Sequence, residues 1–166
     1  TGQERQGSVN SLHLAVDDNL ANFTDPTTGN PSTDANAGNV YIAMGMNVPP
    51  PSPAPAGYQP WVIGLAASSD RAATWGTPAS VAGSVTNGNN SNSPTRPRIA
   101  VSQGAAGNGV AAGSITVIWD ETLAGRQSSP DPLDFIQSRR FTATGNTLTA
   151  AGAAVRHHVR ELRVER

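Results

Sequence analysis

The segment from Trp61 to Trp75 constrains the fold of this chain more than any other stretch. Residues 61–67 form an apolar run, Trp-Val-Ile-Gly-Leu-Ala-Ala, with the length and composition of a buried strand. The residues that follow, Ser-Ser-Asp-Arg-Ala-Ala-Thr-Trp, begin with short polar side chains that hydrogen-bond backbone N–H groups in turns. We therefore predict that Ser68 and Asp70 build a tight turn between two antiparallel strands, with the Trp75 ring across the hairpin base.

The composition favours one all-β domain with long loops. Among 166 residues, 37% are hydrophobic and only 14% are charged, with 17 Gly and 13 Pro. A net charge of −1 provides no field that would recruit nucleic acid or an anionic membrane. No apolar run approaches the roughly 20 residues that span a bilayer. The absence of cysteine excludes disulfides and thiolate metal sites.

The spacing of the turn residues resembles the Asp box, or BNR repeat, of sialidases and related β-propellers. The residues that carry the likeness are Ser68, Asp70, Thr74 and Trp75, and Ala72 stands where that family has glycine. If this position requires a positive φ, alanine carries a steric cost there. The resemblance implies a structural role for these residues, on a face away from any active site. It assigns no catalytic, cofactor-binding or metal-binding residue.

A weak internal repeat predicts two sheets of similar build. Segments 11–17, 39–44, 61–67 and 78–82 correspond to 97–102, 114–119, 135–141 and 147–151, and the Asp box corresponds to a degenerate copy at 142–149. Each unit then has four strands, like one blade of a propeller. We expect an all-β fold with two four-stranded antiparallel blades of a sialidase-like β-propeller, as part of a larger propeller or assembly.

These segments define the expected domain organisation. Residues 1–10 form the end of a preceding blade or an N-terminal flank, 11–95 the first blade and 96–153 the second. Residues 154–166 begin a further blade or form a C-terminal flank, and we favour a strand there. Because the sequence begins at Thr1 and shows no signal peptide, we expect a processed product or a piece of a longer protein.

Two blades cannot close a ring, which needs about four to eight. Apolar sheet faces and strand edges would stay open to water. We expect further blades of the same polypeptide, copies of the chain or other subunits to cover them, and no free folded monomer. A two-sheet sandwich that closes on itself is the alternative. The polar loops at 22–38, 48–60 and 83–94 are also candidate contact surfaces, and the proline-rich 48–60 is favoured.

The sialidase resemblance also raises an enzymatic hypothesis. Enzymes of that family hold the substrate carboxylate with three arginines and use a Tyr–Glu nucleophile pair and an Asp acid. Arg98 lies near the start of a predicted strand, but the family's Arg-Ile-Pro motif is missing because Ala100 follows Ile99. No glutamate is convincingly placed near Tyr41 or Tyr58; the glutamates are Glu4, Glu121, Glu161 and Glu165. We therefore predict no catalytic site and a structural role for Arg98.

Other polar and aromatic groups have simpler explanations than ligand binding. Asp17-Asp18-Asn19 and the acidic loop 25–34 offer oxygen ligands for calcium, but they lack the EF-hand order, and turn formation explains them. His157 and His158 are adjacent, so on a strand they point to opposite faces. Trp119 offers a ring for stacking on a sugar, but we assign it to the core. We predict no metal and no cofactor.

The sequence thus favours a non-catalytic structural or protein-interaction segment of an exported or cell-surface bacterial protein. A carbohydrate-binding, lectin-like propeller module is the first alternative. A fragment of a sialidase-like glycoside hydrolase is the second. The expected partners are other protein subunits or further blades, with glycans as an alternative, and neither nucleic acid nor a membrane span is expected.

Overall fold

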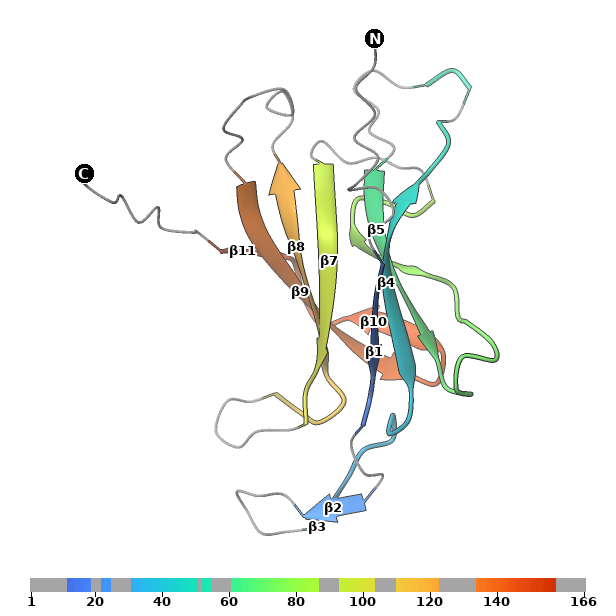
Figure 1. The fold of residues 1–166 in the computed structure, drawn as a ribbon, viewed down its shortest axis with the longest axis vertical. Coiled ribbons are helices and arrows are strands. Elements are labelled where there is room, and N and C mark those ends of the chain that lie inside the picture. The colour runs from blue at the N-terminus through green and yellow to red at the C-terminus, as the bar shows by residue number, and fades with distance from the viewer. Residues whose placement is uncertain are drawn as a thin grey trace, which may run out of the picture.

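The chain folds into two antiparallel β-sheets that face each other (Figure 1). The structure is a computed structural model and describes residues 12–18, 22–24, 31–50, 52–54, 61–86, 93–103, 110–122 and 134–157. These residues contain no helix. The all-β prediction is confirmed for this part of the chain.

The first sheet contains four strands in chain order, as predicted. They are β1 (Leu12–Val16), β4 (Val40–Asn47), β5 (Trp61–Ser68) and β6 (Ala79–Ala82). The polar loop predicted at 22–38 contains two short strands, because β2 (Asn22–Thr24) pairs with β3 (Pro31–Thr33) as a separate hairpin. Phe and Thr favour extended backbone, and the proline is tolerated as the first residue of its strand.

The second sheet repeats this order and adds one strand. It contains β7 (Ser93–Val101), β8 (Ile115–Thr122), β9 (Asp134–Thr144) and β10 (Thr147–Ala150). The long β9 pairs with β10 near its end and with β11 (Val155–His157) near its beginning. Residues 155–157, predicted to open a further unit or to flank the second, therefore belong to this sheet.

The predicted copy of the turn box at 142–149 is wrong. Strand β9 continues to Thr144, and only Gly145 and Asn146 separate it from β10. Gly145 has a φ of 56°, so the chain reverses within two residues by using the left-handed region that glycine adopts easily. The second sheet therefore has a short hairpin where the first has a long turn.

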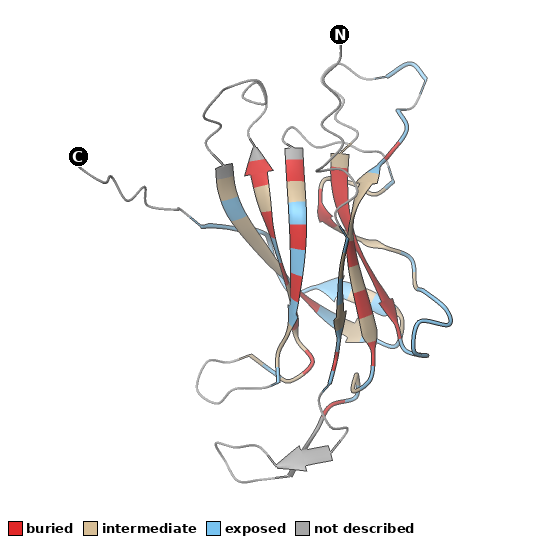
Figure 2. Ribbon diagram, in the orientation of Figure 1, coloured by how far each residue is buried: buried red, intermediate tan, exposed pale blue. Residues whose placement is uncertain are grey.

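The hydrophobic core lies between the two sheets. Alternate residues along each strand point inward, which appears in Figure 2 as red and pale-blue bands along β7. Trp119 is buried among them, as the sequence analysis predicted. The inner faces contribute Tyr41, Ala43, Ile63, Leu65 and Ala67 from the first sheet and Ile99, Ile115, Val117, Trp119 and Phe141 from the second.

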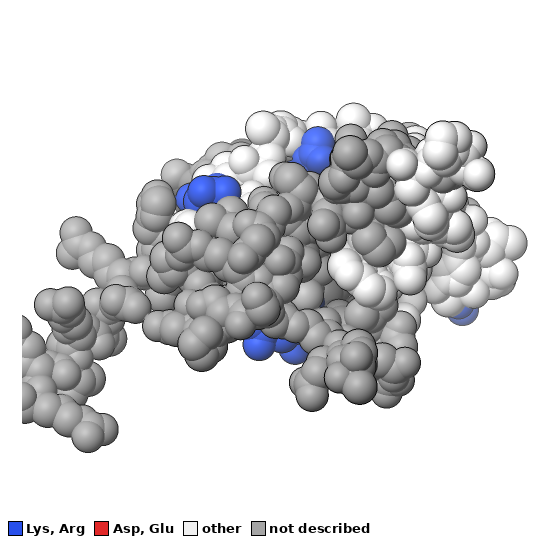
Figure 3. All heavy atoms as spheres, turned by 90° about the horizontal axis from the view of Figure 1, so that it is seen from above, with Lys and Arg blue, Asp and Glu red and all other residues white. Residues whose placement is uncertain are grey.

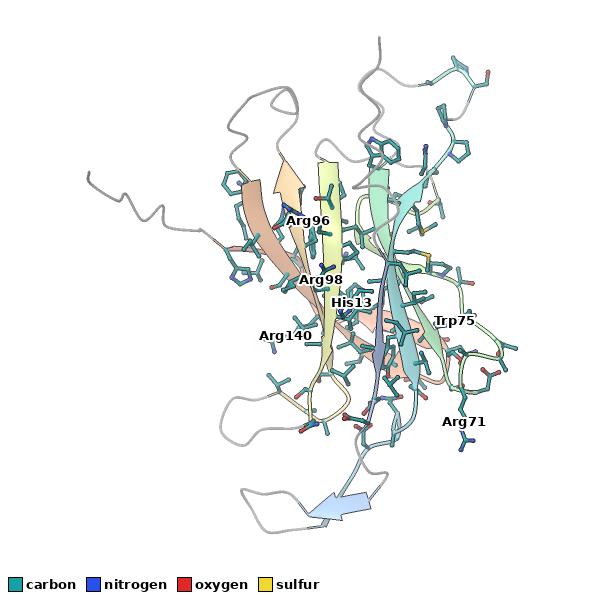
Figure 4. The ribbon with its side chains drawn as sticks, in the orientation of Figure 1. His13, Arg71, Trp75, Arg96, Arg98 and Arg140 are labelled. Atoms are coloured by element: carbon teal, nitrogen blue, oxygen red, sulfur yellow. The ribbon has the colours of Figure 1, made fainter. Side chains whose placement is uncertain are left out.

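Polar contacts join the sheets at both edges. The first strands of the two sheets lie beside each other, and the Ile99 N–H donates to His13 Nδ1 at 3.1 Å between them (Figure 4). At the opposite edge the Arg139 guanidinium of β9 donates to the Ser80 carbonyl of β6 at 3.0 Å. The sheets are therefore stacked with β1 of the first sheet beside β7 of the second, and with the last strands of the two sheets near each other.

The internal repeat is visible in two equivalent turns. Before β4, the N–H of Asp17 donates to the Asn39 carbonyl and the N–H of Gly38 donates to the Asp17 carbonyl, both at 2.8 Å. Before β8, Ser102, Gly113 and Ser114 form the same pair of bonds at the same distances. Both glycines have a positive φ, 83° and 73°. These turns fix which residues of the two sheets correspond.

Candidate functional site

The turn after β5 is held by side-chain hydrogen bonds to its own backbone. The Ser68 hydroxyl donates to Asp70 Oδ1 at 2.7 Å and accepts from the Ala72 N–H at 2.8 Å. Asp70 also accepts from the N–H of Thr74 at 2.8 Å and from the Thr74 hydroxyl. The bond from the Thr74 hydroxyl is the largest cause that lowers the pKa of Asp70 from 3.8 to about 2. The ionised carboxylate of Asp70 thus stabilises the turn.

The backbone of this turn is strained at two positions. Arg71 and Ala72 have φ values of 59° and 68°, in the left-handed region. Ala72 therefore carries the steric cost that a positive φ imposes on alanine. Glycine would adopt this conformation without a Cβ clash.

Trp75, which was predicted to lie across the hairpin base, is partly open to solvent. Its side chain remains 39% exposed. The turn packs against the second sheet. A Cβ added to Gly76 would lie only 2.0 Å from the Asn146 carbonyl oxygen. The turn therefore packs closely against the hairpin between β9 and β10.

Asn146 is the contact residue that the sequence analysis missed. Its side-chain oxygen accepts from both the N–H and the hydroxyl of Ser69 at 2.7 Å, and its amide donates to the Thr74 hydroxyl at 3.4 Å. The Gly-Asn pair signalled a tight turn, but no local pattern indicates which segment a turn will touch. Hydrogen bonds between the turn after β5 and the β9–β10 hairpin therefore join the two sheets.

The outer face of the first sheet is apolar and partly open to solvent. Leu12, Leu14 and Val16 on β1 are 58%, 50% and 49% exposed. Residues paired across a ladder share a face, so these three lie beside side chains of β4 that are half-buried. We define the outer face of the first sheet as Leu12, Leu14, Val16, Val40, Ile42 and Met44.

The second sheet buries the residues that correspond to this face. Counting back from the two equivalent turns aligns Val16 with Val101 and Val40 with Ile115. The full set that corresponds to the outer face of the first sheet is Pro97, Ile99, Val101, Ile115, Val117 and Trp119. All but Val101, which is half-buried, are buried against the first sheet. The same side of the repeat is thus buried in the second sheet, whereas in the first sheet it is exposed along β1 and buried along β5, where Val62 and Ala66 lie.

The outer face of the second sheet is mixed in character. Arg98 and Arg140 are exposed there, and Ile118 and Ile136 are 43% and 37% exposed. We define this face as Arg98, Ala100, Thr116, Ile118, Ile136, Ser138 and Arg140. In the view of Figure 3 the described arginines form separate patches. Arg96 forms an ion pair with Asp120 at 2.6 Å, and the Arg98 guanidinium donates to the neighbouring Pro97 carbonyl.

The residues weighed for a sialidase-like site are not brought together. Arg98 is exposed on the second sheet (Figure 4), whereas Tyr41 is fully buried between the sheets. Glu121 is buried and accepts from the Trp119 indole at 3.0 Å and from Gln137, so Trp119 presents no ring for stacking on a sugar. Tyr58, Glu4, Glu161 and Glu165 lie outside the described residues.

The remaining polar candidates show no metal-binding trio. Ser138 Oγ lies 2.8 Å from His157 Nε2, and Gln103 hydrogen-bonds Asp18. His158, Asn19 and Asp25 are outside the described residues. Within the described ranges no three His, Cys, Asp or Glu side chains gather as metal ligands. The same ranges hold no helix with the length and apolar character needed to cross a membrane.

Comparison with known proteins gave no match to a family model, to a curated protein or to a solved structure.

Proposed function

We propose that this chain is a non-catalytic structural segment that assembles by stacking β-sheets face to face in one direction. Neighbouring blades of an Asp-box β-propeller stack in this way, and an exported or cell-surface protein is the proposed context. The observation that carries the proposal is the correspondence between the exposed outer face of the first sheet and the buried face of the second.

The apolar character of the outer face supports an occupant. Full burial of a Leu or Val side chain contributes about 1.5–3 kcal/mol, so covering three half-exposed side chains would add roughly 1 kcal/mol each. Leu12, Leu14 and Val16 lie in one row on β1, the strand at the edge of the first sheet. An edge strand beside an apolar surface favours contact with another sheet over exposure to water.

The contact between the two sheets within the chain indicates which surface would pack on the outer face of the first sheet. Within the chain, the face containing Ile99 packs against the inner face of the first sheet, where His13 lies. By correspondence, the face containing Leu14 would pack on a surface equivalent to that inner face. The outer face of the second sheet is such a surface, and a second copy of the chain would supply it. The proposed contact is therefore heterologous, with one face of one copy on a different face of the next.

Light scattering over a range of concentrations tests the proposal. We expect the chain to exceed its monomer mass of 17.1 kDa, increasingly so at higher concentration. Leu14→Glu should restore the monomer while keeping the β-rich circular dichroism spectrum, because Leu14 is half-exposed in the folded chain. Ala100→Glu, on the outer face of the second sheet, should also weaken association.

Thr77→Glu is the matched control. Thr77 is exposed in the connection between β5 and β6, on neither outer face, so this variant should associate like the original chain. A folded, cooperatively melting 17.1 kDa monomer at every concentration would overturn the assembly proposal. Cleavage of a fluorogenic sialoside by the purified chain would overturn its non-catalytic part.

A further inference from the structure

His13 joins the two sheets through a hydrogen bond to the free edge of the second sheet. The second sheet ends at β7, and the Ser102 N–H just after this strand donates to the Ser114 carbonyl just before β8. Because backbone groups of an antiparallel strand alternate between its two sides, the Ile99 N–H points away from β8. It donates to His13 Nδ1 at 3.1 Å. The imidazole of β1 therefore supplies the acceptor that a neighbouring strand would otherwise supply.

This hydrogen bond requires an uncharged imidazole. A backbone N–H can only donate, so Nδ1 must keep its lone pair and the ring proton must lie on Nε2. Protonation adds a hydrogen at Nδ1, which then faces the Ile99 N–H, and both groups are donors. Ile99 is buried in the shared core, so its amide loses its acceptor in a place where leaving a donor unsatisfied is costly. Protonation of His13 therefore breaks the bond between the sheets.

The groups around His13 do not favour a charged ring. Strand β1 packs against β4 and β7. The one titratable side chain of β4 is Tyr41, which stays neutral because burial raises its pKa to about 12. The charged side chains of β7 are Arg96 and Arg98, and both are cationic. Along the first strand the next acidic residue is Asp17, four residues away, or roughly 13 Å in extended backbone. Neither packed strand therefore offers a carboxylate that would stabilise a protonated His13.

We propose that His13 is a pH-sensitive contact between the sheets, which holds β7 beside β1 at neutral pH and releases it in acid. Histidine ordinarily changes charge between about pH 5 and 8, and the half-buried His13 is accessible to protons. Because only the neutral ring accepts the bond, its contribution to stability is complete at high pH and is lost as the pH falls. The bond from Arg139 to the Ser80 carbonyl at the opposite edge persists, because arginine stays charged. The contact lies within one chain and does not depend on the proposed assembly.

Urea unfolding at pH about 7.5 and about 5.5, at low protein concentration, is the first test. The Oδ1 atom of asparagine occupies the position of histidine Nδ1 and accepts without titrating, so His13→Asn should keep the bond at both pH values. On acidification, the folding constant of the original chain should fall about fivefold more than that of His13→Asn. Equal responses of the two chains would show that the contact is not pH-sensitive.

His157→Asn is the matched control. His157 Nε2 lies 2.8 Å from Ser138 Oγ, and this hydroxyl can donate to a neutral ring or accept from a charged one. Protonation of His157 therefore leaves neither group without a partner. We expect His157→Asn to keep the pH response of the original chain, and loss of the response in this variant would assign it to His157 instead of His13.

Nuclear magnetic resonance of the folded chain tests the contact without reliance on global unfolding. Near pH 7.5 the His13 ring should carry its proton on Nε2 alone. As His13 gains its second proton, the exchange protection of the Ile99 amide should fall about fivefold, and the amides of β8, which has a strand on each side, should change less. A His13 proton on Nδ1 near pH 7.5, or protection of Ile99 that does not follow the titration of His13, would overturn the proposal.

Discussion

The two sheets share a strand order and a turn, but their outer faces differ. Both run through four strands in sequence, and both close the connection before the second strand with the same backbone bonds and a glycine of positive φ. Yet the outer face of the first sheet carries leucine and valine, whereas that of the second carries Arg98 and Arg140. Backbone geometry is thus repeated, while the side chains on the two outer faces differ.

The turns after β5 and β9 differ as well. The first uses Ser68, Asp70 and Thr74 to satisfy a long, strained turn, and the second needs only Gly145 and Asn146. These unlike turns nevertheless meet, because Asn146 accepts hydrogen bonds from Ser69. The two turns therefore contact each other although their backbones differ.

The largest expected effect is the difference in stability loss between a substitution on the inner face of the second sheet and one on its outer face. Phe141→Ala should lower the free energy of unfolding by about 3–5 kcal/mol, because the ring is 1% exposed in the shared core. Ile118→Ala, on the 43% exposed outer side, should cost about 1 kcal/mol or less in the monomer. Urea unfolding measures both. Similar losses would show that the two faces are not distinguished by burial as described.

A smaller effect tests the meeting of the two turns. Gly76→Ala would place a Cβ 2.0 Å from the Asn146 carbonyl oxygen, so backbone must move. We expect a loss of about 1–3 kcal/mol in urea unfolding. Thr77→Ala, next in sequence and exposed, should change stability by less than about 0.5 kcal/mol. A neutral Gly76→Ala would mean that the turns do not pack in this way.

Ala72→Gly should stabilise the chain slightly. Ala72 has a φ of 68°, and glycine removes the Cβ strain at a modest entropic cost. We expect a gain of about 0.5–1 kcal/mol and a melting temperature about 1–4 °C higher. Ala73→Gly is the control and should give no gain, because Ala73 has no positive φ. Destabilisation by Ala72→Gly would contradict the left-handed turn.

The smallest effect is the pH response of the exposed Asp70. Its pKa is lowered from 3.8 to about 2, so its ionised form stabilises the turn above pH 3.8 and this contribution is lost as the pH falls towards 2. The melting temperature of the original chain should therefore exceed that of Asp70→Asn at pH about 5, and the difference should shrink at pH about 2.5. A difference that stays constant between these values would contradict the bonded carboxylate.

The strands of both sheets are predictable from the sequence, because alternation and apolar runs are local patterns. The short β2 and β3 were missed because they lie in a polar stretch rich in glycine, proline and asparagine. The exposure of Trp75 and the role of Asn146 depend on how the sheets pack, which no local pattern encodes. Asp17 and Asp34 were interpreted as turn formers, and they do lie at turns, but only the packed sheets reveal their burial.

Cysteine pairing between two variants tests the directional stacking most directly. The chain has no cysteine, so introduced thiols report only the intended contact. Within the chain Ile99 bonds His13, and the corresponding residues in a contact between copies are Leu14 and Arg98. We predict that a mixture of Leu14→Cys and Arg98→Cys chains forms a disulfide-linked heterodimer under mild oxidation, while either variant alone stays largely unlinked. Efficient linking of Leu14→Cys to itself, without the mixed product, would contradict head-to-tail assembly.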